Sequence, residues 1–132
     1  MTVAVCVDDK MGMLFNHRRQ SRDKVLIDDL MNIAEKVKIN GFSEALFEDF
    51  KDRIEIDEEF LENAKNEDVC FVEDIDLEPY ADKIDKVILY FWNRHYPSSL
   101  KFNVDLSDYN FIEETEFQGN SHEKITREVY KK

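Results

Sequence analysis

Short apolar runs recur along the chain and predict the strands of a β-sheet. The run at residues 2–7 is β-branched and lacks strict alternation of apolar and polar positions, which is typical of a strand covered on both faces. The run at 87–92 combines branched and aromatic residues, so it too belongs in the centre of the sheet. Two shorter runs, at 37–39 and 69–72, predict two further strands.

Apolar residues at helical spacing lie between these runs and predict three helices. The first begins after Ser21, which can cap it. The second is capped by Ser43 and ends near Asp52, and the third spans residues 57–65. The buried face of the first helix is predicted to consist of Leu26, Ile27, Leu30, Met31, Ile33 and Ala34.

Other parts of the chain are less regular. Residues 10–20 predict a loop or a short strand. The side chains of this segment that are predicted to pack into the core are Met13, Leu14 and Phe15. KFNVDL at 101–106 predicts an edge strand, and NFIEETEF at 110–117 predicts an exposed strand. KITREVY at 124–130 fits a strand or a short helix, and its β-branched and aromatic residues favour a strand.

The order of these elements predicts the fold class. Strands alternate with helices at first and stand alone at the end, which indicates a single α/β domain over residues 1–132. We expect three layers around a mixed sheet, with parallel core strands and an antiparallel C-terminal edge. A chain of 132 residues is long enough to bury one compact core.

The apolar runs also bear on where the protein resides. None approaches the roughly 20 residues of a membrane-spanning helix, and Asp8 and Asp9 interrupt the first run before it reaches the length of a signal peptide. Cys6 and Cys70 lie in separate apolar runs without a metal-ligand or redox spacing, so we expect reduced, buried thiols. The sequence therefore predicts a cytoplasmic protein with no membrane partner.

Acidic charge is concentrated in the middle of the chain. The formal net charge is -12, and residues 44–85 contain 17 acidic and four basic side chains, so the rest of the chain is nearly neutral. Such an acidic surface repels nucleic acid, and no nucleic-acid partner is expected. Against this background, three of the six arginines lie between residues 18 and 22.

Polar residues at predicted turns and strand ends outline a candidate ligand site. If the strands at 2–7 and 87–92 are parallel neighbours, the segments that follow them meet at one edge of the sheet, where the first helix also begins. Helix N-termini and arginine side chains bind phosphate or carboxylate. The residues predicted to bind an anionic small molecule are Asn16, His17, Arg18, Arg19, Arg22, Asn93, Arg94, His95, Ser121 and His122.

Other interpretations of these residues stay open. The arginines could simply neutralise nearby carboxylates of an acidic protein. A metal is not expected, because zinc sites usually show ligand pairs at short spacing, and adjacent carboxylates such as Asp8 and Asp9 point in opposite directions unless the chain turns. Ser121 and His95 have the residue types of a nucleophile and its base. The sequence leaves open whether the protein binds a cofactor and whether it is an enzyme.

The first strand resembles the beginnings of two known families. VAVCVDD followed by VCFVED is similar to the acidic strand ends of response-regulator receivers, but the path to Asp74 is too long and the later Thr/Ser and Lys are missing. VAVCVDDKMGM also resembles the opening of dihydrofolate reductases, whose glycine-rich cofactor signature is missing here. We set both likenesses aside as chance.

Three polar segments carry a further resemblance. DDKMGMLFNHRRQSRD, WNRHYP and GNSHEKIT are similar to segments of short uncharacterised bacterial proteins, some of them labelled ribonuclease Z. That label implies a zinc-dependent metallo-β-lactamase nuclease, but this chain lacks the HxHxDH motif and is too short for that fold. The resemblance implies a family without a mechanism.

Two functional hypotheses follow. The first is an uncharacterised domain that binds an anionic small molecule, a phosphate or a carboxylate, in a cleft lined by His, Arg and Asn. The second is an acidic interaction or regulatory module without a small-molecule site, in which Glu58, Glu59 and Glu62 face a basic protein partner.

Overall fold

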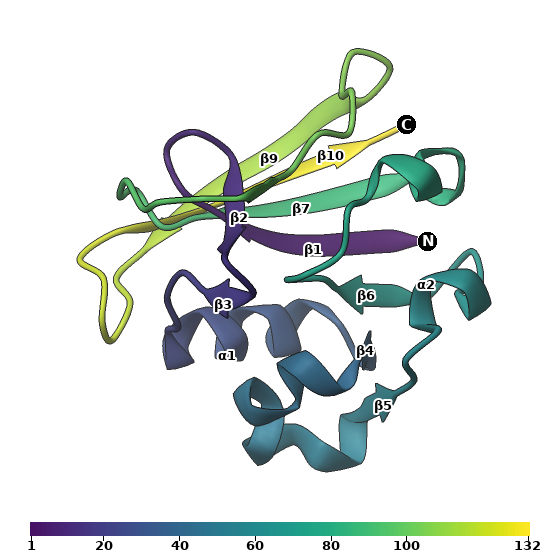
Figure 1. Ribbon diagram of the computed structural model, residues 1–132, viewed down its shortest axis with the longest axis horizontal. Helices are drawn as coiled ribbons and strands as arrows, with labels where there is room; N and C mark the ends of the chain where they lie inside the picture. Colours follow the sequence, from purple (N-terminus) through teal and green to yellow (C-terminus); the bar gives the residue numbers. More distant parts are fainter.

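The computed structural model describes residues 1–132. A mixed sheet of seven strands organises the chain (Figure 1). Its strands are β1 (Thr2–Val7), β4 (Val37–Ile39), β5 (Ile54–Ile56), β6 (Val69–Phe71), β7 (Lys86–Phe91), β9 (Asn110–Phe117) and β10 (Ile125–Lys131). Their order in the sheet is β5-β4-β6-β1-β7-β10-β9. β1 runs parallel to β6 and β7, as expected for the most apolar strands. β10 runs antiparallel between β7 and β9.

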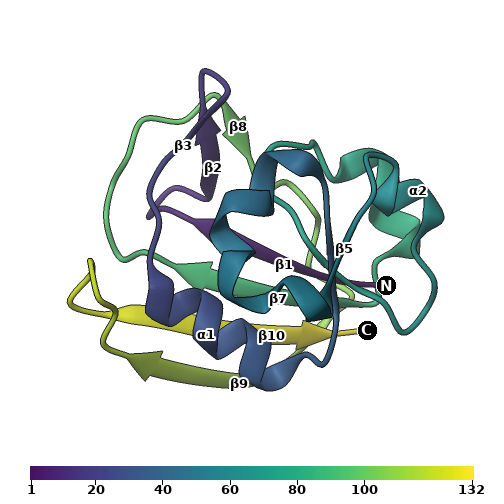
Figure 2. The same ribbon diagram turned by 90° about the horizontal axis from the view of Figure 1, so that it is seen from below.

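Both faces of this sheet are covered. α1 (Lys24–Ile33) and the 3₁₀ helix η1 (Gly41–Arg53) pack on one face, in front of the sheet in Figure 2. The other face carries α2 (Phe60–Asn63), the 3₁₀ helix η2 (Glu78–Lys83) and a small antiparallel sheet of β2 (Gly12–Phe15), β3 (Arg18–Arg19) and β8 (Leu100–Lys101). The apolar cores on the two faces contain 17 and 15 buried residues, so neither face is left open. The predicted α/β fold with a mixed sheet is confirmed.

The first helix begins later than its predicted cap. Asp23, and not Ser21, is the capping residue, because its Oδ1 accepts the N–H groups of Val25 at 3.0 Å and Leu26 at 3.4 Å. Ile33 was predicted to be buried but is 46% exposed, since it lies in the last turn, where the chain leaves α1 for β4.

The next two helical segments are tighter or shorter than predicted. The segment after Ser43 is not a regular α-helix but part of η1, whose backbone leaves helical geometry at Phe47 and Phe50. Phe47 is buried edge-on against Phe71, with ring centroids 5.2 Å apart, so the packing of this side chain outweighs local helix preference. The helix predicted at 57–65 is reduced to the single turn of α2.

Of the remaining predictions, some are confirmed and others are wrong. Met13 and Leu14 are buried as expected, but Phe15 is 40% exposed because it ends β2 beside the exposed β2–β3 turn. The strand predicted at 101–106 is limited to β8, which pairs with β2 and not with the large sheet. The C-terminal segment is a strand, β10, because β7 and β9 provide partners on both sides of it. None of the helices has the length and apolar character needed to cross a bilayer.

A pair of like charges on the β9–β10 hairpin gives a first testable prediction. Glu114 and Glu128 face each other across β9 and β10, and the hydrogen bond between their side chains raises the pKa of Glu114. Because the carboxyl pKa is raised, the hydrogen bond between the two side chains stabilises the fold at low pH, and this stabilisation is lost as the pH rises through that pKa. We expect Glu114→Gln to raise Tm by roughly 1–4 °C at pH 7, with the gain disappearing near pH 4.

The control for this prediction is Glu116→Gln on the same strand. Glu116 lies 3.1 Å from the Lys124 ammonium group, so its replacement removes an attraction and should give no gain. Thermal unfolding of both variants at pH 7 and pH 4 makes the comparison. An equal rise in Tm for the two variants would mean that the gain comes from a lower net negative charge, and not from removing the repulsion between Glu114 and Glu128.

Candidate functional site

The carboxyl ends of β6, β1 and β7 meet at one edge of the large sheet. The chain leaves β1 toward one side of the sheet and returns on the other side with β7. In open α/β sheets, a crevice at such a reversal of strand order is the usual position of a ligand. Asp8 follows β1, Glu73 lies just beyond β6 and Trp92 follows β7, and all three residues are buried.

Asp8 ties the loops after β1 and β7 together. Its carboxylate accepts the N–H groups of Lys10 at 3.0 Å, Gly12 at 2.7 Å and Tyr96 at 3.0 Å. Burial by itself raises the pKa of Asp8, but these hydrogen bonds outweigh burial and lower it. Asp8 is therefore an ionised structural acceptor, while the adjacent Asp9 is exposed.

Asp23 joins the start of α1 to the β9–β10 hairpin. Its carboxylate accepts the N–H groups of Asn120 at 3.1 Å and Ser121 at 2.9 Å. Burial by itself raises the pKa of Asp23, but these donors and a contact with His122 lower it to about 2. A Cβ atom at Gly119 would clash with this carboxylate, so the hairpin reaches Asp23 only with glycine at that position.

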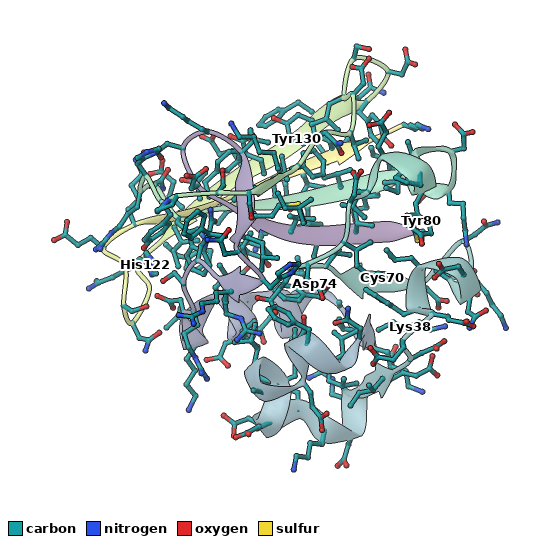
Figure 3. The ribbon with its side chains drawn as sticks, in the orientation of Figure 1. Lys38, Cys70, Asp74, Tyr80, His122 and Tyr130 are labelled. Atoms are coloured by element: carbon teal, nitrogen blue, oxygen red, sulfur yellow. The ribbon has the colours of Figure 1, made fainter.

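His122 is buried where the β9–β10 hairpin turns, at one end of the molecule (Figure 3). Its Nδ1 lies 3.1 Å from Oδ2 of Asp23. Its Nε2 lies 3.2 Å from the Ser21 hydroxyl and 3.1 Å from the Tyr96 hydroxyl. The imidazole also stacks on Trp92, with ring centroids 4.5 Å apart and an interplanar angle of 25°. These contacts hold the ring in one orientation.

An ion pair covers the end of β6. The Arg19 guanidinium donates to both oxygens of Glu73, including an Nη2–Oε1 bond of 2.8 Å, and to the carbonyl of Phe42 at 3.0 Å. Ser43 donates its hydroxyl to the same carboxylate at 2.7 Å. The hydrogen bond with Glu73 raises the pKa of Arg19, so this guanidinium stays charged and is committed to a carboxylate of the protein.

An open cleft of about 490 Å³ lies between the N-terminal end of α1, η1 and the β9–β10 hairpin. Its volume is in the range of small-molecule sites. The apolar lining residues are Ile27, Ala45 and Leu46. The polar lining residues are Arg22, Asp23, Lys24, Glu48, Asp49, Asn120 and Ser121. The cleft therefore has an apolar strip and a polar rim of both charge signs.

The ten predicted site residues do not all converge on this cleft. Arg22 and Ser121 line it, and His122 lies in the adjacent hydrogen-bond network. Arg19 is held by Glu73 over the end of β6.

The other predicted residues lie around the same edge of the sheet. Asn93 donates its side-chain amide to the Lys124 carbonyl at 3.1 Å and to the Thr126 hydroxyl at 3.0 Å. His95 is exposed, with Nδ1 3.6 Å from Asp8. The remaining four, Asn16, His17, Arg18 and Arg94, are exposed on loops or on β3. No group of three or more His, Cys, Asp or Glu side chains is arranged to hold a metal ion.

Sequence reasoning missed several residues of this region. Asp23 was not among the predicted residues, although an Asp just before a helix is a recognisable cap. Ser21 was predicted to be that cap, but its hydroxyl lies next to His122. The suggested pair of Ser121 and His95 does not form, since His95 lies next to Asp8. Glu73 follows one apolar run and Trp92 ends another, and neither residue carried any further signal.

The architecture is similar to that of a solved enzyme. It matches the dihydrofolate reductase from Enterococcus faecalis complexed with NADP(H) and RAB-propyl, over 99% of this chain and 95% of that one, with a TM-score of 0.66 and 11% sequence identity. No protein-family model matches the sequence, and no curated protein matches it significantly. At this identity the likeness shows the fold, which is that of dihydrofolate reductase.

This likeness corrects four conclusions drawn from the sequence. The assignment to uncharacterised bacterial proteins, some labelled ribonuclease Z, was wrong. The functional hypotheses of an anion-binding domain and of an acidic interaction or regulatory module were also wrong. A physical reason is visible in the basic residues, since Arg19 is committed to Glu73 and does not turn toward an external anion. Setting aside the likeness of VAVCVDDKMGM to dihydrofolate reductases was wrong for the fold.

Proposed function

We propose that the chain binds a flat, amino-substituted heterocycle of the folate class in the cleft between α1 and η1. The main support is the position and size of this cleft, about 490 Å³ beside the N-terminal end of α1, in a chain with the fold of a dihydrofolate reductase. Of the ten residues predicted from the sequence, Arg22 and Ser121 are proposed to contact the ligand.

The cleft lining complements both the face and the polar edge of such a ring system. Ile27, Ala45 and Leu46 offer an apolar surface to the face of the ring. The carboxylates of Glu48 and Asp49 can accept hydrogen bonds from ring amino and N–H groups. Asp49 also pairs with Lys24 at 3.3 Å, but both side chains are exposed, so this contact is weak and easily exchanged for a ligand.

A dinucleotide such as the NADP(H) of the enterococcal enzyme does not fit the end of β6. A pyrophosphate is usually held by a glycine-rich turn and the N-terminus of a helix. Here β6 is followed by Val72, Glu73 and Asp74, and the next helical element is the six-residue 3₁₀ helix η2. The two carboxylates repel phosphate, and Arg19 is occupied in neutralising Glu73. The proposed function is therefore ligand binding without a reaction that uses NADP(H).

We also propose that the protein is cytoplasmic and has no nucleic-acid partner. The first point is supported by two free cysteines, Cys6 and Cys70. Burial raises the pKa of Cys70 to about 11, which keeps that thiol protonated and unreactive. The second point is supported by the formal net charge of -12.

Calorimetric titration with dihydrofolate and folate tests the proposed binding. We expect saturable binding of one equivalent per chain, and a rise in Tm that grows with ligand concentration. Ala45→Trp places an indole in the cleft and should weaken binding by at least about tenfold, because the ring can no longer lie on the apolar strip. NADPH, titrated separately, should not bind.

The matched control is Ala81→Trp on η2, which does not line the cleft and should bind as the unmodified chain does. Lack of saturable binding to either pterin compound would refute the proposed ligand class. If both tryptophan substitutions weaken ligand binding equally, the ligand does not bind in the proposed cleft. Tight binding of NADPH would refute the exclusion of the dinucleotide.

A further inference from the structure

Three side chains at the base of the β9–β10 hairpin are connected as in a nucleophile–base–acid series. Oδ2 of Asp23 lies 3.1 Å from Nδ1 of His122, and Nε2 of the same ring lies 3.2 Å from Oγ of Ser21. Asp23 and His122 are buried, whereas Ser21 is partly exposed. A nucleophilic hydroxyl needs a base within hydrogen-bond reach and a third group that orients the base, and these contacts supply both.

The protonation of His122 follows from its partners. The Asp23 carboxylate is ionised and can only accept, so its 3.1 Å contact with Nδ1 requires a proton on Nδ1. In a neutral ring, Nε2 then carries the lone pair and faces the Ser21 hydroxyl. This is the tautomer that a general base needs. After it takes a proton, Nε2 can donate to the Tyr96 oxygen at 3.1 Å, and the Trp92 ring face favours the resulting cation.

Two small hollows and two backbone donors lie at Ser21. Two hollows of about 10 Å³ each border Ser21, and each is about large enough for one water molecule. Gln20 lines one of them, and its Oε1 is buried without a hydrogen-bond partner. The backbone N–H groups of Ser21 and Arg22 make no hydrogen bond within the protein, so they are free to donate to an oxyanion.

We propose that Ser21 is a nucleophile activated by His122 and oriented through Asp23, and that it hydrolyses short-chain acyl esters. Ser21 Oγ forms a bond to the acyl carbon while its proton passes to Nε2 of His122. The carbon–oxygen bond to the leaving alcohol then breaks, and that oxygen takes the proton from Nε2. Water then gives a proton to Nε2 while its oxygen forms a bond to the acyl carbon. The bond between that carbon and Ser21 Oγ breaks, Oγ takes the proton back from Nε2, and the acid is released. This activity does not depend on the ligand proposed for the α1–η1 cleft.

A fluorophosphonate probe tests the nucleophile directly. Attack by Ser21 forms an oxygen–phosphorus bond and expels fluoride, which leaves a stable adduct that peptide mass spectrometry can locate. We expect one adduct per chain at Ser21, and Ser21→Ala should reduce labelling at least about 100-fold. His122→Gln, checked for folding by circular dichroism, should slow labelling by about 10²-fold or more. Hydrolysis of p-nitrophenyl acetate should fall in parallel.

The control is Ser107→Ala, which removes an exposed hydroxyl far along the chain and should label at the unmodified rate. Absence of the adduct from Ser21 would overturn the proposal, as would labelling of Ser21→Ala within twofold of the unmodified protein. If His122→Gln does not fold, the Ser21→Ala result decides alone, since that substitution removes only one partly exposed hydroxyl.

Discussion

Replacing Asp23 with alanine should destabilise the fold by about 3–5 kcal/mol. The buried carboxylate caps α1 through Val25 and holds the β9–β10 hairpin through the N–H groups of Asn120 and Ser121. Alanine leaves all of these donors without an acceptor, and it removes the charge that faces His122. Urea unfolding monitored by Trp92 fluorescence measures the loss, because this ring stacks on His122.

Two variants separate the causes of this loss. Asp23→Asn keeps one oxygen acceptor for the cap and should lose less stability than Asp23→Ala. Ser21→Ala removes a hydroxyl from the same network without affecting the cap and should lose less than about 1 kcal/mol. If Asp23→Ala costs no more than Ser21→Ala, the carboxylate is not the group that joins α1 to the hairpin.

The pKa of Asp23 gives the same residue a pH signature. The folded-state pKa of about 2 lies below the ordinary value of 3.8, so the stabilising contribution is present above pH 3.8 and is lost as the pH falls toward 2. Integrated over this interval, the loss is about 2 kcal/mol. Asp23→Asn should therefore show a flatter stability curve than the unmodified protein between pH 4 and pH 2. Parallel curves would contradict the depressed pKa.

The fold could be predicted from the sequence because its main determinants are local. The apolar runs of β1 and β7 have no polar face, and such strands lie in the middle of a parallel sheet. The choice between strand and helix for β10 and the kinks of η1 were less accessible, because they depend on the partners provided by β9 and by Phe71. Burial of one aromatic side chain outweighs a weak helix preference.

The candidate site was less accessible because its contacts are long-range. Asp23 meets His122 across 99 residues of sequence, and Arg19 meets Glu73 across 54. Residue types at turns identified His122 and Arg19 as polar residues of interest, but not whether another side chain already occupies them. The missing glycine signature was the reason for rejecting the fold of dihydrofolate reductase. However, glycines after a strand determine how closely a phosphate can approach, and not whether the strand forms. The strand pattern and the phosphate site are separate properties of the chain.

Replacing Asp8 with alanine should cost about 2–4 kcal/mol. The fully buried carboxylate accepts N–H groups from Gly12 at 2.7 Å and Tyr96 at 3.0 Å, and alanine leaves these donors buried and unpaired. The effect should be concentrated where the loops after β1 and β7 join. Hydrogen exchange should show that the amides of Gly12 and Tyr96 lose protection before the amides of β10 do.

The neighbouring residue provides a matched control for this substitution. Asp9 carries the same charge one position along the chain, but its side chain is exposed. Asp9→Ala should therefore change stability by no more than about 0.5 kcal/mol and leave the Tyr96 amide protected. Because Tyr96 also places its hydroxyl 3.1 Å from Nε2 of His122, loosening this loop should slow fluorophosphonate labelling of Ser21 in Asp8→Ala and not in Asp9→Ala. Equal effects of the two substitutions would show that charge at this strand end matters, and that the buried hydrogen bonds of Asp8 do not.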